Sequence, residues 1–135
     1  CLLSRGLGDV YKRQAQTLAY IKRFAPVERK APLAGNTIGT DRMFLAKYMS
    51  QVDQWLHYRN VDVSSIKELS RRWYPRVFFQ APAKDGGHRA LADILESIRE
   101  LRYYREAVFV DEPGPSSDDA RDIAARTVSE FTPNM

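Results

Sequence analysis

Cysteine is almost missing from this chain of 135 residues, since Cys1 is the only one. A single thiol cannot form an internal disulfide, so the sequence predicts a reducing compartment, with the cytoplasm as the default location. No apolar run approaches the roughly 20 residues that a membrane-spanning helix needs, and we expect no membrane-inserted segment. With only two histidines, the chain lacks the Cys/His clusters typical of zinc sites. Its length predicts one ordinary domain with a core.

Charge is unevenly distributed along the chain. The overall +4 at pH 7 divides into +2 for residues 1–14, +6 for residues 15–110 and −4 for residues 111–135. A basic middle suits an anionic partner such as a short nucleic acid, although a charge of this size is far from diagnostic.

The two ends look unlike the middle. Residues 1–14 show neither helical nor strand periodicity, and two glycines interrupt them, so we interpret them as a non-native leader. Residues 111–135 begin with the linker "DEPGPSSDD" and continue into a predicted short helix capped by Ser116 or Ser117. Whether that helix is frayed or docked on a partner stays open.

Residues 15–110 carry an alternating pattern of helices and strands. The apolar spacing predicts a helix over 15–25, which must end before Pro26. "APLAGNT" and "NVDVSS" predict two short core strands. "TDRMFLAKYM" predicts a helix whose apolar face includes Asp41, and Ser65 with Glu68 predicts a capping box at the start of the next helix. The fold class is therefore α/β, rich in helices.

A last core helix is predicted from about Arg89 to Tyr104. Asp93 lies about 130° from the centre of its aliphatic stripe, beside small residues that leave room for an ion. The glycine-rich stretch before the helix carries His88. His88 and Asp93 fit a base and a carboxylate that share a metal-bound water, but also an ordinary loop residue and a solvated helix residue. The stripe that we expect to be buried consists of Leu91, Ile94, Leu95, Ile98 and Leu101.

Three stretches together resemble one family over nearly all of residues 15–110. The stretches are "GNTIGTDRMFLAKYM", "HYRNVDVSSIKELSRRWYP" and "HRALADILESIRELRYYR". They are similar to the second half of the sequence of oligoribonuclease-family proteins. These are small dimeric 3′–5′ exoribonucleases of the DEDDh group, with an RNase H-like fold. The resemblance implies that residues 15–110 are the C-terminal part of such an exonuclease domain, truncated at its N-terminal strands.

The resemblance also implies a metal site. In this group four acidic residues hold two divalent metals, and a histidine takes a proton from the attacking water. Asp41 matches the acid of the second motif, Asp93 the acid of the third, and His88 the general base. Hard oxygen ligands imply Mg²⁺ or Mn²⁺. For Asp41 a second interpretation stays open, because aspartate in a first helical turn also binds free N–H groups.

Substrate contacts carry over in the same way. The set that caps the 5′ phosphate of a dinucleotide in the family falls here on Thr37, Arg59 and Ser64, which implies a preference for very short RNAs. We expect Ser64 to lie just before the N-terminus of a helix, whose free N–H groups attract anions. Tyr58 matches a tyrosine that reaches the active site of the neighbouring subunit, which implies a homodimer. Alternatively, Tyr58 packs within its own chain and Arg59 pairs with Asp62.

The family's first motif, a strand with Asp-x-Glu, has no counterpart in residues 1–14. We therefore expect this chain to be a fragment that is inactive alone. A different class stays open as well, a non-catalytic module that binds nucleic acid or protein through Tyr58, Arg59, Trp73, Tyr103 and Tyr104. A proofreading subunit or a tRNA-trimming exonuclease is a third possibility, against which "HYRNVDVSSIKEL" argues.

Overall fold

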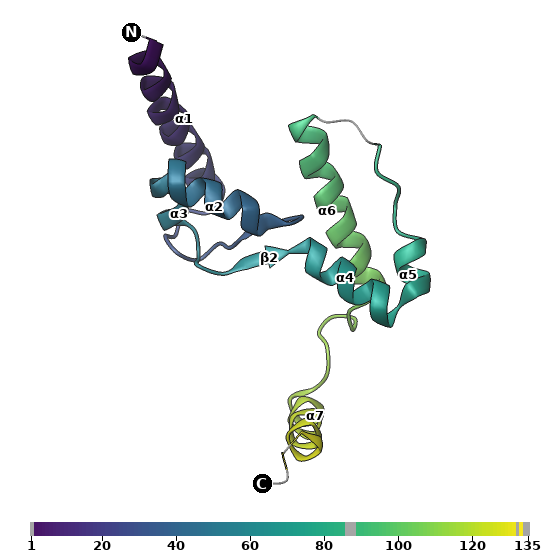
Figure 1. Cartoon of the computed structure of the whole chain (residues 1–135). Coiled ribbons are helices and arrows are strands. Elements are labelled where there is room, and N and C mark those ends of the chain that lie inside the picture. Colours follow the sequence, from purple (N-terminus) through teal and green to yellow (C-terminus); the bar gives the residue numbers. More distant parts are fainter. Residues whose placement is uncertain (1, 86–88, 132, 134–135) are drawn as a thin grey trace.

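The computed structural model describes residues 2–85, 89–131 and 133, with side chains from residue 6 onward except residue 7 (Figure 1). Two short strands and a series of helices make up these residues. In chain order they are α1 (Leu2–Phe24), β1 (Leu33–Gly35), α2 (Ile38–Tyr48), α3 (Ser50–Trp55), β2 (Asn60–Asp62), α4 (Val63–Trp73), α5 (Pro75–Phe79), α6 (Ala90–Ala107) and α7 (Ser117–Glu130).

The strands β1 and β2 form a parallel pair, with Ala34 opposite Val61 and Gly35 opposite Asp62. Parallel strands need a crossover connection, and α2 with α3 supplies it. Helix α2 packs on both strands and on α3, while α4 packs on β1, α5 and α6. A helix-rich α/β arrangement with two short parallel strands is thus confirmed for the described residues, although no residue of either strand is fully buried.

Helix α1 begins far earlier than predicted. It runs through residues 2–14 as well as the expected segment. Gln14 is buried, and its Oε1 accepts a hydrogen bond of 3.2 Å from the Gln51 N–H, which ties α1 to α3. The pattern of residues 1–14 therefore failed to predict a helix, because two glycines inside a helix lower the helix propensity without ending the helix. The interpretation of residues 1–14 as a non-native leader stays a prediction.

The predicted capping box at the start of α4 is wrong. The helix begins two residues earlier, at Val63, and Asp62 is its N-cap. The Asp62 carboxylate accepts a hydrogen bond of 3.0 Å from the Ser64 N–H. Glu68 instead pairs with Arg72 at 2.9 Å on the exposed side of the helix. The carboxylate at the last position of β2 is thus the stronger cap here.

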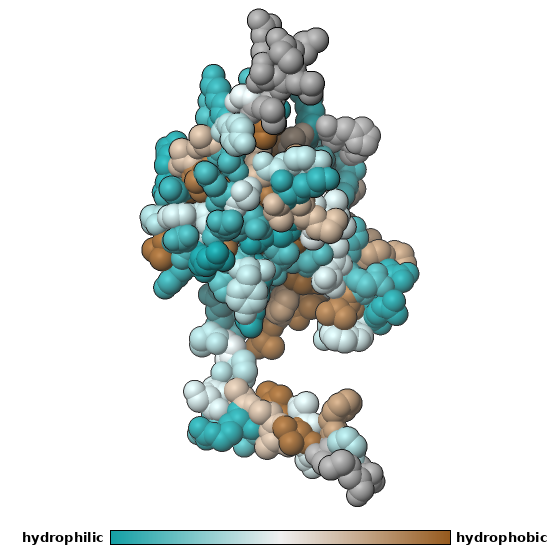
Figure 2. Space-filling model, turned by 60° about the vertical axis from the view of Figure 1, so that its left-hand side comes forward, coloured by the Kyte–Doolittle hydropathy of each residue, from teal (hydrophilic) through white to brown (hydrophobic). Residues whose placement is uncertain are grey.

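The predicted buried stripe of α6 is also wrong, because four of its five members are exposed and Leu101 is only half-buried. Leu91, Ile94, Leu95 and Ile98 are between 45% and 68% exposed. Their helix packs on α4 with a different side, which buries Glu100 and Tyr104. Apolar side chains are exposed on the body of the molecule and on α7 (Figure 2). The apolar core of the described residues is small and consists of Ile38, Val52, Leu56, Val63 and Tyr104.

Helix α7 lies apart from the other elements (Figure 1). It buries none of its residues. Ser116 is its N-cap, with Oγ accepting a hydrogen bond of 3.1 Å from the Asp119 N–H. The predicted short helix and its Ser116 cap are therefore confirmed. In the described part of the chain no helix is both long and apolar enough to cross a membrane.

Candidate active site

A cavity of about 490 Å³ lies where the C-terminal end of β1 meets the start of α2 and the first half of α6. Asp41 and Asp93, the two predicted metal acids, both line it. Each belongs to the first turn of its helix. Residues 52 positions apart in the sequence thus share one cavity. The other polar lining residues are Asn36, Lys84, Glu96 and Ser97.

The direction of Asp41 depends on its neighbour Arg42. The Arg42 guanidinium binds the Asp53 carboxylate at 2.6 Å and donates to the backbone oxygens of His57 at 2.8 Å and Asp53 at 3.0 Å. It also lies 3.3 Å from the Asn60 side-chain oxygen. These contacts tie α2 to α3 and to the turn before β2. Successive residues on a helix point about 100° apart, so Asp41 is left free to face the cavity.

Carboxylate oxygens are the ligands that Mg²⁺ and Mn²⁺ prefer, so Asp41 and Asp93 fit a divalent cation in their chemistry. Two acids are nevertheless fewer than a two-metal site needs. Among residues 2–85 and 89–131 no cluster of three or more Asp, Glu, His or Cys side chains is suited to hold a metal. Asp41 and Asp93 as metal ligands therefore stay a prediction.

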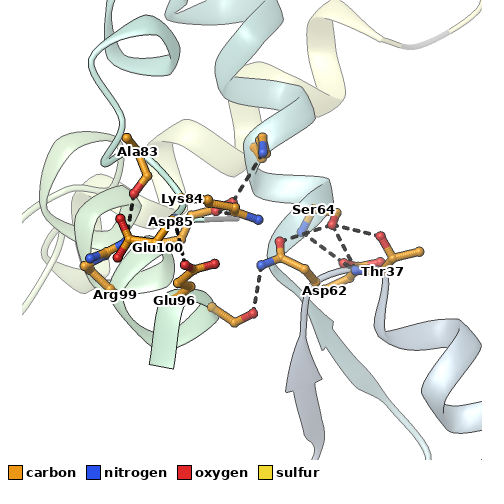
Figure 3. A network of polar contacts seen from close by, with 12 residues as sticks. Thr37, Asp62, Ser64, Ala83, Lys84, Asp85, Glu96, Arg99 and Glu100 are labelled. Carbon is orange, nitrogen blue, oxygen red and sulfur yellow. Dashed lines mark hydrogen bonds and ion pairs between the residues drawn. The ribbon is translucent and has the colours of Figure 1, made fainter. Parts of the chain in front are cut away.

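A polar network joins the end of β1 to the start of α4 and to α6 (Figure 3). The Thr37 N–H lies 3.0 Å from Asp62 Oδ1 and 2.9 Å from Ser64 Oγ, and the two hydroxyls of Thr37 and Ser64 are 3.2 Å apart. Ser64 Oγ donates to Asn36 Oδ1, and Asn36 Nδ2 donates to Ser97 Oγ at 2.9 Å. The network extends from the two hydroxyls to a wall of the cavity.

Thr37 has a left-handed backbone, with φ 51° and ψ 41°. A β-branched residue rarely adopts this conformation, because its side chain crowds the backbone. Backbone strain of this kind concentrates at functional sites, where the surroundings hold it in place. Here the contacts to Asp62 and Ser64 hold it.

One expectation about Ser64 is wrong. We expected Ser64 just before the N-terminus of a helix with free N–H groups for an anion. Ser64 is instead the second residue of α4, and its own N–H is bound to Asp62. The Asp62 carboxylate already occupies the helix end, so the hydroxyls of Thr37 and Ser64 remain as the groups that can contact a phosphate.

Tyr58 and Arg59 lie at the other end of β2 from Ser64. Tyr58 is exposed and stacks on His57 with ring centroids 4.6 Å apart, and the Arg59 guanidinium lies 5.4 Å from the Tyr58 ring centroid. The structure brings Thr37 and Ser64 together but does not bring Arg59 to them. The alternative pair of Arg59 with Asp62 is not formed either, because Asp62 Oδ1 accepts the N–H groups of Thr37 and Ser64.

His88 lies outside the described residues. Asp85 precedes it, and Arg89, which follows it, is the N-cap of α6. The chain on both sides of His88 thus lies beside the helix that carries Asp93.

The aromatic residues of the non-catalytic alternative differ in their environments. Tyr104 is 0% exposed, so no base can stack on it. Burial raises the pKa of Tyr104, and the neighbouring Glu100 and Tyr103 add to that shift. The Tyr103 hydroxyl donates to the Val77 oxygen at 2.7 Å. Trp73 is exposed and does not join the core.

Lys84, Glu96 and Asn36 line the cavity but were not among the predicted site residues. Glu96 had a signal in the sequence, because it lies one turn after Asp93 at helical spacing. Asn36 directly precedes Thr37. Lys84 had no such signal, since its place depends on how the segment before α6 folds back.

Comparison with known proteins defines the class. Residues 6–101 match the model of the exonuclease family of the RNase T type, so the chain belongs to that family. The match implies an RNase H-like fold, in agreement with the parallel strands and the helices around them. It begins inside residues 1–14, whose interpretation as a leader stays a prediction.

Within that family the chain is a homologue of the oligoribonucleases. It is 67% identical over 120 residues to the oligoribonuclease of Leifsonia xyli subsp. xyli, a match that covers 89% of this chain and 58% of that protein. For the oligoribonuclease of Streptomyces avermitilis the identity is 63% over 115 residues, covering 85% and 58%. For that of Corynebacterium glutamicum it is 51% over 138 residues, covering 96% and 63%. The chain thus spans about three-fifths of these relatives.

Proposed function

We propose that this chain is the larger part of a 3′–5′ exoribonuclease that degrades short oligoribonucleotides, dinucleotides above all, to mononucleotides. The observation that carries the proposal is the shared cavity of Asp41 and Asp93. Those two acids come from separate motifs of the oligoribonuclease pattern. A cytoplasmic location belongs to the same proposal.

In this proposal Asp41 and Asp93 hold divalent cations, Mg²⁺ or Mn²⁺. Two such ions, when bound, lower the pKa of the attacking water and offset the charge that builds on the phosphate oxygens. His88 takes the proton from that water. Two further acids are needed, and the family pattern assigns them to an Asp-x-Glu strand that this chain lacks.

The hydroxyls of Thr37 and Ser64 support the choice of substrate. They lie 3.2 Å apart at the edge of the network that leads to the cavity, so both can bind one terminal phosphate. A capped phosphate close to the metal acids leaves room for few nucleotides between them. Short RNAs are therefore favoured over long ones.

Tyr58 and Arg59 support a homodimer. Both lie in one turn at the start of β2, away from Thr37 and Ser64. The family pattern sends Tyr58 to the site of the neighbouring subunit. A neighbouring subunit whose site contains Tyr58 would contain Arg59 as well. Arg59 would then join Thr37 and Ser64 of that subunit in binding the terminal phosphate.

The exposed stripe of α6 supports the expectation that the chain is inactive alone. Ile94 and Ile98 line the same cavity as Asp41 and Asp93 and remain uncovered. A segment that covered them would also lie next to the two acids. The matches leave about two-fifths of each of these relatives uncovered.

The decisive experiment joins this chain to the part of the Leifsonia xyli oligoribonuclease that precedes the matched region. We expect the fused protein to hydrolyse a dinucleotide in Mg²⁺ and the unfused chain to show only background hydrolysis. Substitution Asp93→Asn in the fusion should abolish turnover while the fusion stays folded by circular dichroism. A fused, folded protein without turnover, or full turnover by the unfused chain, would contradict the proposal.

The non-catalytic module is the second candidate, favoured by the exposed Tyr58, Arg59 and Trp73. It predicts that the fused and unfused proteins bind a labelled dinucleotide equally and that neither cleaves it. Equilibrium binding measured beside the turnover assay separates the two functions.

A further inference from the structure

A buried carboxylate lies between two lysines behind the cavity. Glu100 is 6% exposed, and its Oε2 lies 3.3 Å from Lys84 Nζ while its Oε1 lies 3.9 Å from Lys67 Nζ. No hydrogen bond from a described residue reaches Oε1. Two cations thus share one anion, and the group carries a net charge of about +1. The two lysine side chains are 39% and 42% exposed, so only the carboxylate is buried, and a buried carboxylate is costly unless a cation lies beside it.

The two lysines differ in their surroundings. Lys67 extends from the middle of α4 and does not line the cavity. Lys84 lines the cavity together with Asp41 and Asp93. Lys67 can neutralise Glu100 by itself, which leaves the charge of Lys84 available to a second anion.

Lys84 is also held in place more firmly than an ordinary surface lysine. Its neighbours on both sides are bound to α6, as the Arg99 guanidinium donates to the Ala83 oxygen at 2.9 Å and Glu96 Oε1 accepts the Asp85 N–H at 3.0 Å (Figure 3). Together with the ion pair between Lys84 and Glu100, these contacts come from positions 96, 99 and 100, within about one turn of the helix that carries Asp93. The position of Lys84 relative to Asp93 is therefore set by one rigid element.

We propose that Lys84 binds the phosphate to be cleaved, and that Glu100 is the positioning residue that holds Lys84 at the cavity. This inference rests on the proposed function. The cavity is otherwise lined by three acids, Asp41, Asp93 and Glu96, which repel an anionic substrate. A lysine on its wall offsets that repulsion with a fixed charge close to the phosphate. Thr37 and Ser64 lie on another element and serve the terminal phosphate.

The test uses the fused protein and measures binding and hydrolysis separately. Binding is measured in Ca²⁺ with three dinucleotides: one with an ordinary phosphodiester, one with an uncharged methylphosphonate linkage, and one without the 5′ phosphate. We expect Lys84→Met to weaken binding of the ordinary dinucleotide about 10- to 100-fold, the scale of a lost charge-assisted contact. The same substitution should leave binding of the methylphosphonate dinucleotide nearly unchanged, because the charge that Lys84 recognises is absent there.

Three further variants separate charge from structure. Lys84→Arg keeps the charge and should restore most of the binding. Glu100→Gln releases the lysine and should weaken binding less than Lys84→Met does. Lys67→Met, the matched control, removes the other lysine beside Glu100 and should change binding by less than about threefold. Circular dichroism confirms that each variant is folded.

Several outcomes would overturn the inference. Equal losses for the phosphodiester and the methylphosphonate would show a structural effect instead of a phosphate contact. A loss that depends only on the 5′ phosphate would move Lys84 to the cap. Equal effects of Lys84→Met and Lys67→Met would remove the distinction between the lysines. Hydrolysis separates this inference from the proposed function. If the fused protein turns over normally and Lys84→Met changes neither binding nor turnover, only the inference is overturned. If binding depends on the charge of Lys84 but the fused protein does not hydrolyse the dinucleotide, only the proposed function is overturned.

Discussion

The two sides of α6 are a contrast within one helix. One side carries Glu100 and Tyr104, which are polar groups, and it is buried against α4. The other carries Leu91, Ile94, Leu95 and Ile98, and it is exposed. Isolated helices gain little stability without an apolar partner surface, and exposed apolar patches mark surfaces that bind something. The difference teaches that α6 has one covered side, which is largely polar, and one apolar side that no described residue covers.

The contrast is tested most strongly by placing charge on the exposed side. We expect Ile94→Asp combined with Ile98→Asp to leave the thermal midpoint of the 135-residue chain almost unchanged. In the fused exonuclease the same pair should prevent folding, because two unpaired carboxylates in a covered interface cost well over about 5 kcal/mol. Dinucleotide turnover and circular dichroism measure the outcome. A fused double variant that folds and turns over normally would mean that nothing covers this side.

The buried side is tested by Tyr104→Ala. Removing a fully buried aromatic side chain should lower the free energy of unfolding by about 3–5 kcal/mol, through lost burial and the cavity left behind. Leu95→Ala, on the exposed side of the same helix, is the matched control and should cost less than about 1 kcal/mol. Urea titrations of the three proteins give the values. Similar losses from both substitutions would erase the distinction between the sides.

Alkaline pH should weaken the buried side selectively. Burial raises the pKa of Tyr104 above its ordinary value, so above pH about 10 the phenol ionises more readily in the unfolded chain than in the folded one. The stability that depends on the neutral phenol is present below that pH and is lost as pH rises through the folded-state pKa. Stability of the parent should therefore fall more steeply above pH 10 than that of Tyr104→Phe. Parallel curves from urea unfolding at pH 8, 10 and 11 would contradict this account.

The smallest effect is expected from the tail. Truncation after residue 110 removes α7, which buries none of its residues, and the exposed ion pair between Arg105 and Glu112. Exposed pairs contribute little, so the thermal midpoint should stay the same within error. Ser116→Ala in the intact chain should lower helical content alone, because it removes the cap of α7. A clear drop in the midpoint on truncation would show that α7 docks on the body.

Much of the fold could be predicted from local pattern. The strands and the helices α2 and α6 begin and end close to the predicted residues, because turn residues and apolar spacing mark them. The pattern also separated α7 from the body, through the linker and the Ser116 cap. It failed for the sides of α6, since an aliphatic stripe indicates which side seeks burial but not whether a partner surface is present.

The site was predictable in part. The family pattern pointed to Asp41 and Asp93, and the structure brings these two residues, from different helices, to one cavity. Nothing local to Lys84 or Glu100 indicated a role, because a buried carboxylate between two lysines arises only when α4, α6 and the segment before α6 come together. The capping bond of Asp62 to the Ser64 N–H is local and was missed, whereas its bond to Thr37 joins residues 25 positions apart and had no local signal.

The contacts of Arg42 affect Asp41, a residue that does not take part in them. By bonding to α3 and to the turn before β2, this guanidinium stops α2 from rotating about its own axis. The direction of the adjacent Asp41 carboxylate is thereby set by contacts that lie about 100° around the helix from it, away from the cavity. Replacing Arg42 by an apolar residue would leave Asp41 and Asp93 in the sequence, and yet we expect the Asp41 carboxylate to turn away from the cavity.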